Sequence, residues 1–329
     1  MIKIGYANVP QEYFDYISRF KGKIQKWYEK GEMGNGKTKV DVCWKCKVIF
    51  RYLKNKDNLK KYLLVPADKL PDLIQYVEKK YPELKDDREG TSDERSKLYV
   101  CLSKAFDVLG YRENDFPDFA LCNTIGVKAC PYCNEEDIIT YEIKDESVKI
   151  RNSELDHFYS REKHPYLSVS LYNLIPSGSI CNGGHCKHHK DVYKEQLVNP
   201  FALSDSEGIR FELDVIDKGL MAYTTFDKAC RIKTYVVDKR LAPNAQMFLI
   251  AGRYKQEMEQ ARSIWALHYV CGADGYRKAM EEKSKKLGQQ LTFEEWFYSE
   301  TQVDPRDYNK RKLSKLSVDI WRQSENGRM

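Results

Sequence analysis

The residues best suited to chemistry lie in one stretch of the chain, residues 154–191. It holds five of the six histidines and two of the ten cysteines. A carboxylate directly precedes an imidazole at Asp156 and His157, and two asparagines follow at Asn173 and Asn182. Such groups suit either a metal centre that performs chemistry or one that only holds a fold.

Hydrolysis of a phosphodiester at neutral pH needs a base that activates water and a hard cation that neutralises developing charge. Asp156 offers an oxygen ligand suited to Mg²⁺ or Mn²⁺, and Asn182 can offer a second. His157 should point to the other side of a strand, so we expect it to be the general base. Asn173 can hold the intervening loop against this base through its side-chain amide.

Cysteines frame these residues. Cys130 and Cys133 form a CxxC pair, which presents two thiolates to one tetrahedral structural Zn²⁺ and needs two further ligands. Cys181 is expected to be the third. A second CxxC pair ending there would need cysteine at position 178, which is Gly178. We therefore expect Cys186 to be the fourth ligand, with a neighbouring histidine as the alternative.

The order of these groups resembles the HNH endonucleases of the ββα-metal class. The resemblance implies that His157 is the general base, that Asn173 is architectural, and that Asp156 and Asn182 hold the catalytic cation. Asn182 stands where many members have histidine, and other members carry asparagine there. The matching residues are Asp156-His157, Asn173-Leu174 and Cys181-Asn182, inside the frame opened by Cys130-Pro-Tyr-Cys133.

Further runs narrow the resemblance to the bacterial HNH proteins of anti-phage defence, such as the nuclease subunit of Septu systems. It covers residues 125–205 and implies an endonuclease that cleaves nucleic acid, with DNA expected, beside an ATPase partner. The runs are Leu155-Asp-His-Phe158, Pro165-Tyr-Leu167, Tyr172-Asn-Leu-Ile-Pro176 and Val198-Asn-Pro-Phe201.

Two basic clusters could contact a nucleic-acid backbone. The first should lie on a helix beside the catalytic cation, where a phosphate would meet positive charge. The second, near the C-terminus, could equally be a solvated helix face. No base-reading motif accompanies either. The clusters are Lys187, His188, His189 and Lys190, and then Lys310, Arg311, Lys312, Lys315 and Arg322.

The composition is that of an ordinary soluble globular protein: 329 residues, 42% hydrophobic and 32% charged, with a net charge of +6. No run approaches the roughly 18 apolar residues of a membrane span, and MIKIGYANVPQEYF has no signal-peptide core, so we expect a cytoplasmic protein without a membrane partner. In that compartment, the cysteines are metal ligands or core residues more often than disulfides. We expect Cys43 and Cys46 to pack in the core, and His164 to lie in a surface loop.

Three regions should position these groups. Residues 1–120 are predicted to be mainly helical, with helices at 11–30 and 98–109, the second entered by a capping box at 91–94. Residues 121–205 should form the nuclease core with structural zinc, including a hairpin of strands 138–143 and 147–151 and a helix within 187–198. Residues 206–329 should hold a second hairpin and further helices.

In that last region the hairpin strands are expected at 209–216 and 220–225. Helices are expected at 242–266, 275–286, after a capping box at Thr292 and Glu295, and at 308–323. The predicted class is therefore α+β: a mostly helical protein with a small zinc-stapled ββα-metal core and an additional β-hairpin.

A non-catalytic protein is the alternative. The zinc-stapled unit would then bind nucleic acid or a partner protein, as an adaptor within a complex. The presence of Asp156, His157 and Asn182 together favours the enzyme, because a binding module has no need of all three.

Overall fold

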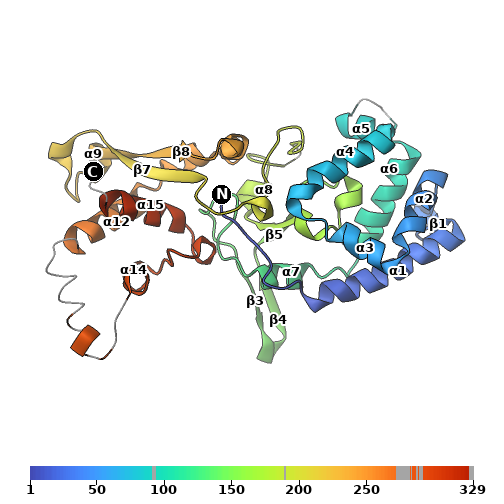
Figure 1. Ribbon diagram of the computed structural model, residues 1–329, viewed down its shortest axis with the longest axis horizontal. Helices are drawn as coiled ribbons and strands as arrows, with labels where there is room; N and C mark the ends of the chain where they lie inside the picture. Colours follow the sequence, from blue (N-terminus) through green and yellow to red (C-terminus); the bar gives the residue numbers. More distant parts are fainter. Residues whose placement is uncertain are drawn as a thin grey trace.

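Helices fill one end of the molecule in the computed structural model, which describes residues 1–90, 94–188, 190–271, 282, 284–286, 288 and 292–325 (Figure 1). The first, α1 (Gln11–Lys30), confirms the predicted bounds and ends at Gly31, whose φ of 72° suits a glycine C-cap. The helices that follow are α2 (Trp44–Leu53), α3 (Lys56–Leu63), α4 (Leu70–Lys80), α5 (Pro82–Glu89), α6 (Lys97–Leu102) and α7 (Asp118–Ile125).

The helix predicted at 98–109 has a different start and an irregular second half. Helix α6 begins after Ser96, whose side chain accepts a hydrogen bond from the Tyr99 N–H at 3.1 Å. The predicted capping box at 91–94 lies mostly outside the described residues. After α6 the backbone continues as a π-helix, Ser103–Tyr111. Such bulges often occur at functional sites.

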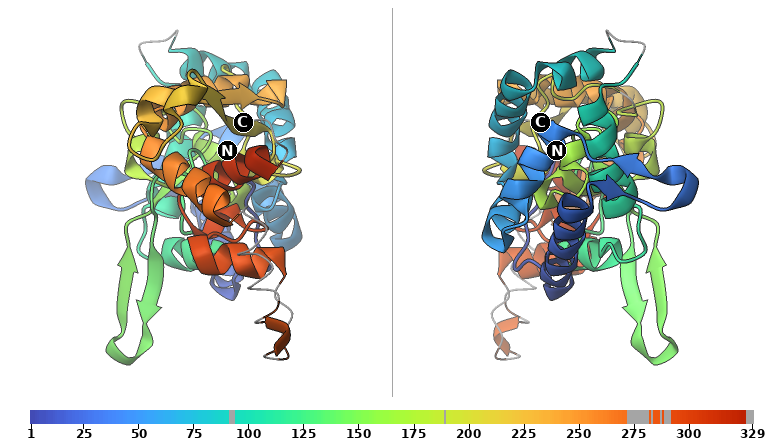
Figure 2. Two further views of the ribbon diagram at one scale, coloured as in Figure 1. Left: turned by 90° about the vertical axis from the view of Figure 1, so that its left-hand side faces the viewer. Right: turned by 90° about the vertical axis from the view of Figure 1, so that its right-hand side faces the viewer.

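The central part of the chain forms small antiparallel hairpins. Strands β3 (Thr140–Ile143) and β4 (Val148–Arg151) confirm the first predicted hairpin, which projects away from the body of the molecule in both views of Figure 2. Strand β5 (Glu154–His157) then pairs with β6 (Leu174–Ser177), and the four-residue helix α8 (Ser179–Asn182) follows directly.

The prediction of a helix within residues 187–198 was wrong, because the described residues there form turns. The Asp191 carboxylate accepts hydrogen bonds from the backbone N–H groups of Tyr193 and Lys194, at 3.1 and 3.2 Å. Gln196 has a φ of 55°. These local hydrogen bonds and the left-handed residue favour a turn over a helix.

The C-terminal hairpin has a longer connection than predicted. Strand β7 (Ile209–Val215) pairs with β8 (Cys230–Val236), whereas residues 220–225 do not form a strand. The Asp217 side chain accepts a hydrogen bond from the Gly219 N–H at 2.8 Å, which starts a 3₁₀ turn (Lys218–Leu220) in place of a tight reversal. Helix α9 (Phe226–Ala229) completes the connection.

The single helix predicted at 242–266 is divided into three. The first break is at Leu249, whose φ is 53°. The capping box at Thr292 and Glu295 is confirmed at the start of α14 (Phe293–Thr301). Most of the predicted helix 275–286 lies outside the described residues. The remaining helices are α10 (Ala242–Met247), α11 (Ile250–Tyr254), α12 (Met258–Cys271) and α15 (Ser314–Glu325).

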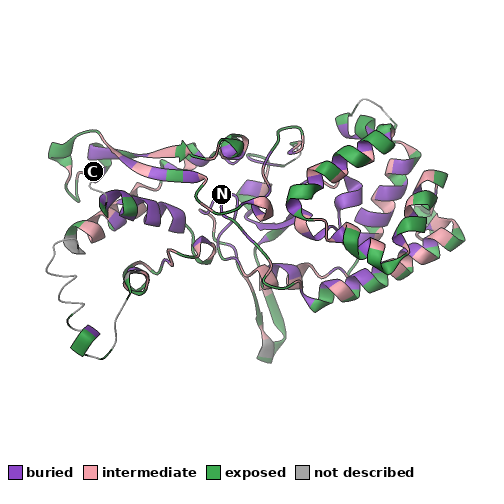
Figure 3. Ribbon diagram, viewed as in Figure 1, coloured by how far each residue is buried: buried purple, intermediate pink, exposed green. Residues whose placement is uncertain are grey.

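Helix α15 is buried along most of its length (Figure 3). Its Asp319 and Gln323 side chains accept hydrogen bonds from the backbone of β7, at 3.0 and 2.7 Å. Lys315 is 2% exposed and pairs with Asp319 and Glu207. Lys315 is therefore a buried ion-pair residue, and its predicted role in a surface that contacts nucleic acid was wrong.

The described residues combine many helices with small antiparallel hairpins, which confirms a mixed, mainly helical class. Within that part of the chain, every helix is too short or too polar to cross a bilayer.

Candidate functional site

Strand β5 brings Asp156 and His157 to a single cleft. The two residues are 4% and 8% exposed, and their side chains have different partners on opposite faces of the strand. Both line a cleft of about 410 Å³. Asn182 from α8 and Tyr111 from the π-helix line it as well.

His157 is held as a neutral imidazole. Its Nε2 atom lies 2.8 Å from the carbonyl oxygen of Ser168. Because a carbonyl can only accept, Nε2 carries the hydrogen and Nδ1 keeps a free lone pair. Burial lowers the pKa of His157 to about 4, so the ring is neutral at pH 7. The Tyr111 ring packs edge-on against it, 4.3 Å between centroids.

Asn173 fixes the loop that supplies the Ser168 carbonyl. The Asn173 Oδ1 atom accepts a hydrogen bond from the Tyr159 N–H at 2.7 Å. Its Nδ2 group donates to the carbonyl oxygens of Tyr159 and Leu167, both at 3.1 Å. The side chain is fully buried. The structure therefore places this amide where it ties the start of the loop to its middle.

Both carboxylate oxygens of Asp156 are engaged. The Tyr132 hydroxyl donates to Oδ2 at 2.6 Å, and the Lys187 Nζ group donates to Oδ1 at 2.6 Å. Lys187 was predicted to lie on a surface helix, but it lies in a turn and is 2% exposed. The correction has a physical reason, since a buried carboxylate needs an opposite charge or hydrogen-bond donors close by.

The other predicted groups lie around this centre. The Asn182 Nδ2 group donates to Glu154 Oε2 at 2.6 Å. His188 and Lys190 are exposed, and His188 lines the cleft. His189 lies outside the described residues.

His164 is buried, contrary to the prediction of a surface loop. It is 1% exposed, and its Nδ1 atom lies 3.1 Å from the Tyr166 hydroxyl. The Tyr159, Tyr166 and Tyr193 rings surround the imidazole. The loop that carries His164 therefore turns inward and contributes its aromatic side chains to the core.

The donors in the cleft fit a hard divalent cation. The Asp156 carboxylate and the Asn182 amide both line it, and such oxygen atoms are the ligands that Mg²⁺ and Mn²⁺ prefer. The Lys187 ammonium at Asp156 Oδ1 shows that this position accepts positive charge.

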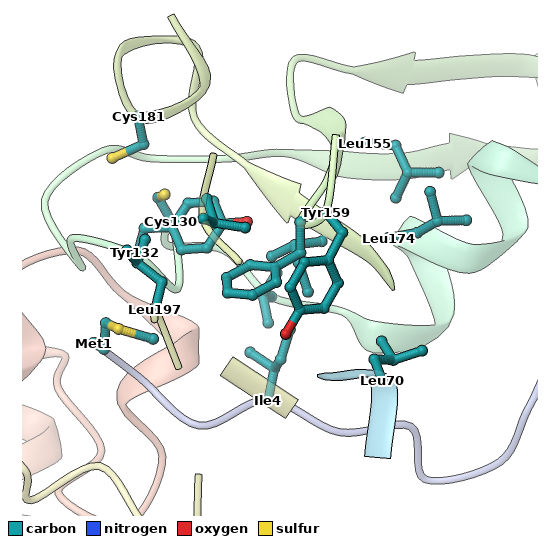
Figure 4. Packing of buried hydrophobic residues seen from close by; sticks show 14 of the residues in the cluster. Met1, Ile4, Leu70, Cys130, Tyr132, Leu155, Tyr159, Leu174, Cys181 and Leu197 are labelled. Atoms are coloured by element: carbon teal, nitrogen blue, oxygen red, sulfur yellow. The ribbon is translucent and has the colours of Figure 1, made fainter. Parts of the chain in front are cut away.

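Three thiols and one carboxylate form a second cluster. The ligand atoms of Cys130, Cys133, Cys181 and Glu136 all lie within 4.8 Å of one another. This cluster could bind a metal such as zinc. Figure 4 shows Cys130 and Cys181 on facing segments, with Tyr132 beside Cys130. Cys186, the predicted fourth ligand, is not one of these four groups, because the Glu136 carboxylate is the fourth. The Cys186 thiol is buried beside Cys181, and a hydrogen bond between the two thiols is the main cause that lowers the pKa of Cys186 to about 7.

Glu136 explains the glycine at position 178. A Cβ atom on Gly178 would lie 2.0 Å from Glu136 Oε2. The Glu136 carboxylate also accepts hydrogen bonds from the backbone N–H groups of Ile180 and Cys181, at 3.1 and 3.2 Å. It therefore occupies the space that a cysteine side chain at 178 would need. Its position three residues after Cys133 repeats the CxxC spacing, which was the signal available in the sequence.

Arg253 of α11 brings positive charge to this cluster. Its Nη1 group lies 3.2 Å from Cys181 Sγ, and the guanidinium also pairs with Glu135 and Glu136. The neighbouring Tyr254 hydroxyl donates to the Cys133 carbonyl at 2.7 Å. These partners come from far along the chain, so no local pattern could reveal them.

The Cys43 and Cys46 pair lies in the N-terminal helices, against a third cysteine, Cys101. Cys46 and Cys101 are buried, and the Cys43 N–H donates to Cys101 Sγ at 3.4 Å. Cys46 therefore packs in the core as predicted, while Cys43 is half-buried. Among the described residues, the cluster around Cys130 is the group of metal-binding side chains that lies close enough for one ion.

The chain is similar to the Septu protein PtuB of Bacillus thuringiensis, with 36% identity over 75 residues. The match covers 22% of this chain and 28% of that protein, so it spans well under half of either. No family model matches the chain, and no solved structure matches it. This partial likeness suggests a relation to Septu defence proteins.

Proposed function

We propose that the chain is a metal-dependent HNH endonuclease that hydrolyses phosphodiester bonds in nucleic acid, with DNA as the expected substrate. The observation that carries the proposal is the orientation of His157, whose Nε2 lies 2.8 Å from the Ser168 carbonyl and whose side chain shares one cleft with Asp156 and Asn182.

In this proposal His157 removes a proton from water at Nδ1. The Ser168 carbonyl holds the opposite nitrogen, so the imidazole stays in the required tautomer and orientation. After His157 has taken up the proton, its Nε2–H group still donates a hydrogen bond to the Ser168 carbonyl, which stabilises the imidazolium. Asn173 positions His157 indirectly, because its side chain fixes the loop that carries Ser168.

Asp156 and Asn182 would hold Mg²⁺ or Mn²⁺ through their side-chain oxygens. The bound cation would neutralise charge on the phosphate and on the leaving 3′ oxygen. Tyr132 positions the carboxylate through its hydrogen bond to Oδ2.

We propose a structural zinc ion at the thiol cluster, with Cys130, Cys133, Cys181 and Cys186 as ligands. Glu136 lies within the cluster, but we favour Cys186 because four cysteine thiolates are a common ligand set of structural zinc. The Cys186 thiol lies against Cys181, and a thiolate is a preferred zinc ligand.

The biological role in this proposal is that of a nuclease effector in a bacterial anti-phage system with an ATPase partner. The likeness to the Septu protein PtuB supports the defence role. An adjacent gene for an ATPase, whose product co-purifies with this chain, is the expected finding. A chain encoded alone, or an ATPase that does not bind it, would contradict the partnership.

The enzymatic proposal is tested by incubating plasmid DNA with the full chain, alone and with its co-purified partner, in Mg²⁺, Mn²⁺ or EDTA. We expect nicking or linearisation with either cation and none in EDTA. His157→Ala should abolish cleavage and leave the circular dichroism spectrum unchanged. His185→Ala is the matched control, because His185 is exposed and belongs to the same segment.

Cleavage by the His157→Ala variant at the wild-type rate would refute the mechanism. A wild-type complex that binds DNA but leaves it intact in both cations would favour the adaptor, in which the zinc-stapled unit only binds nucleic acid or protein.

A further inference from the structure

Lys187 is a buried lysine whose ammonium group contacts the proposed catalytic centre. Its Nζ atom lies 2.6 Å from Asp156 Oδ1 and 2.5 Å from the His157 carbonyl oxygen. The Lys187 N–H also donates to the Cys181 carbonyl at 3.2 Å, which fixes the backbone of Lys187 beside the thiol cluster. The ammonium therefore contacts the side chain of Asp156 and the backbone, not the imidazole, of His157.

The other carboxylate oxygen of Asp156, Oδ2, also accepts a hydrogen bond. Tyr132 donates to Oδ2 at 2.6 Å, and its ring is fully buried and stacked on Phe248 with 4.4 Å between centroids. This packing keeps the hydroxyl in place. A cation that approaches Asp156 at Oδ1 therefore meets the Lys187 ammonium there.

An ammonium and a divalent cation that bind the same carboxylate oxygen compete for it. Their like charges repel strongly in a buried site, where little water screens them. Lys187 also lines the cleft, so its flexible side chain can leave Asp156 and remain within the cleft.

We infer that Lys187 is an internal counter-ion: it neutralises Asp156 in the cation-free protein, and a divalent cation that binds Oδ1 displaces it. The inference rests on the proposed function, since it takes Asp156 as a ligand of the cation. It assigns Lys187 a positioning role that limits how tightly the cation binds.

The test is Mn²⁺ binding to the full chain, measured by the electron paramagnetic resonance signal of free Mn²⁺. Lys187→Met keeps the volume and removes the charge, so it should bind Mn²⁺ at least about tenfold more tightly than wild type. Lys187→Arg keeps the charge and should show no such gain. Asp156→Asn, alone and combined with Lys187→Met, should lose this binding.

The binding data distinguish failure of the counter-ion inference from failure of the proposed cation site. If Asp156→Asn removes Mn²⁺ binding but Lys187→Met does not tighten it, the counter-ion inference is wrong and the proposed cation site stands. If Asp156→Asn leaves Mn²⁺ binding unchanged, both the counter-ion inference and the proposed cation site are wrong.

A second measurement avoids substitution, in case Lys187→Met does not fold. Reductive methylation with mass spectrometry should label Lys187 weakly without cation and several-fold more strongly with saturating Mg²⁺. Exposed Lys190 is the internal control and should be labelled in both conditions. Equal labelling of Lys187 with and without Mg²⁺ would overturn its displacement.

Discussion

Replacing Asn173 by alanine should destabilise the protein strongly, because one side chain satisfies three buried backbone groups. These are the N–H and carbonyl of Tyr159 and the carbonyl of Leu167. Tyr159 and Leu167 are 2% and 0% exposed, so water cannot simply replace the amide. An unsatisfied buried polar group costs about 1–3 kcal/mol, and with partial relaxation we expect a loss of roughly 3–5 kcal/mol.

That loss is a large fraction of the roughly 5–15 kcal/mol that stabilises a typical domain. It can be measured by urea unfolding followed by circular dichroism. Hydrogen exchange should quicken first in residues 158–173, the loop that Asn173 holds. Asn182→Ala is the matched control, since its amide donates one bond to an exposed carboxylate and should cost less than about 1 kcal/mol.

A loss below about 1 kcal/mol for Asn173→Ala, with unchanged exchange in residues 158–173, would refute this reasoning. The amide would then be replaceable by water or by a local shift of the backbone.

The remaining predictions concern the metal and pH. Cys130→Ser or chelation should cause unfolding, because structural zinc contributes directly to folding free energy; a stable, folded variant would contradict the zinc site. Mass spectrometry of metal content should find one zinc per chain in wild type and in Glu136→Gln but less in Cys186→Ser, and the reverse order would make Glu136 the ligand. Burial lowers the pKa of His164 to about 3 from its usual 6.5, so between these values the unfolded chain binds a proton that the folded chain does not. The free energy of unfolding should fall as pH drops from 6.5 toward 3, and less so in His164→Gln; equal pH profiles by urea unfolding would exclude this contribution.

Local patterns in the sequence predicted the parts of the fold that depend on neighbours in the chain. The apolar spacing in residues 11–30 predicted α1, and the alternating strands around a polar turn predicted the β3–β4 hairpin. Asp156 and His157 are adjacent in one strand, and Asn182 follows soon after the paired strand, so their closeness along the chain was visible in the sequence.

Long-range contacts account for what the sequence did not reveal. Lys187 resembled a surface lysine, but its ammonium pairs with the buried carboxylate of Asp156, 31 positions earlier in the chain. Tyr111, the last residue of the π-helix, lines the cleft from a region that precedes the site by more than 40 residues. Arg253 contacts Cys181 from a helix 72 positions away in the chain.

The contact between Gly178 and Glu136 restricts how related sequences can vary. A chain that gains cysteine at 178 must move the Glu136 side chain or shorten residue 136, because a Cβ atom at 178 would lie 2.0 Å from Glu136 Oε2 and 2.9 Å from Glu136 Cβ. The two positions should therefore covary among homologues, with a small residue at 178 where residue 136 is glutamate.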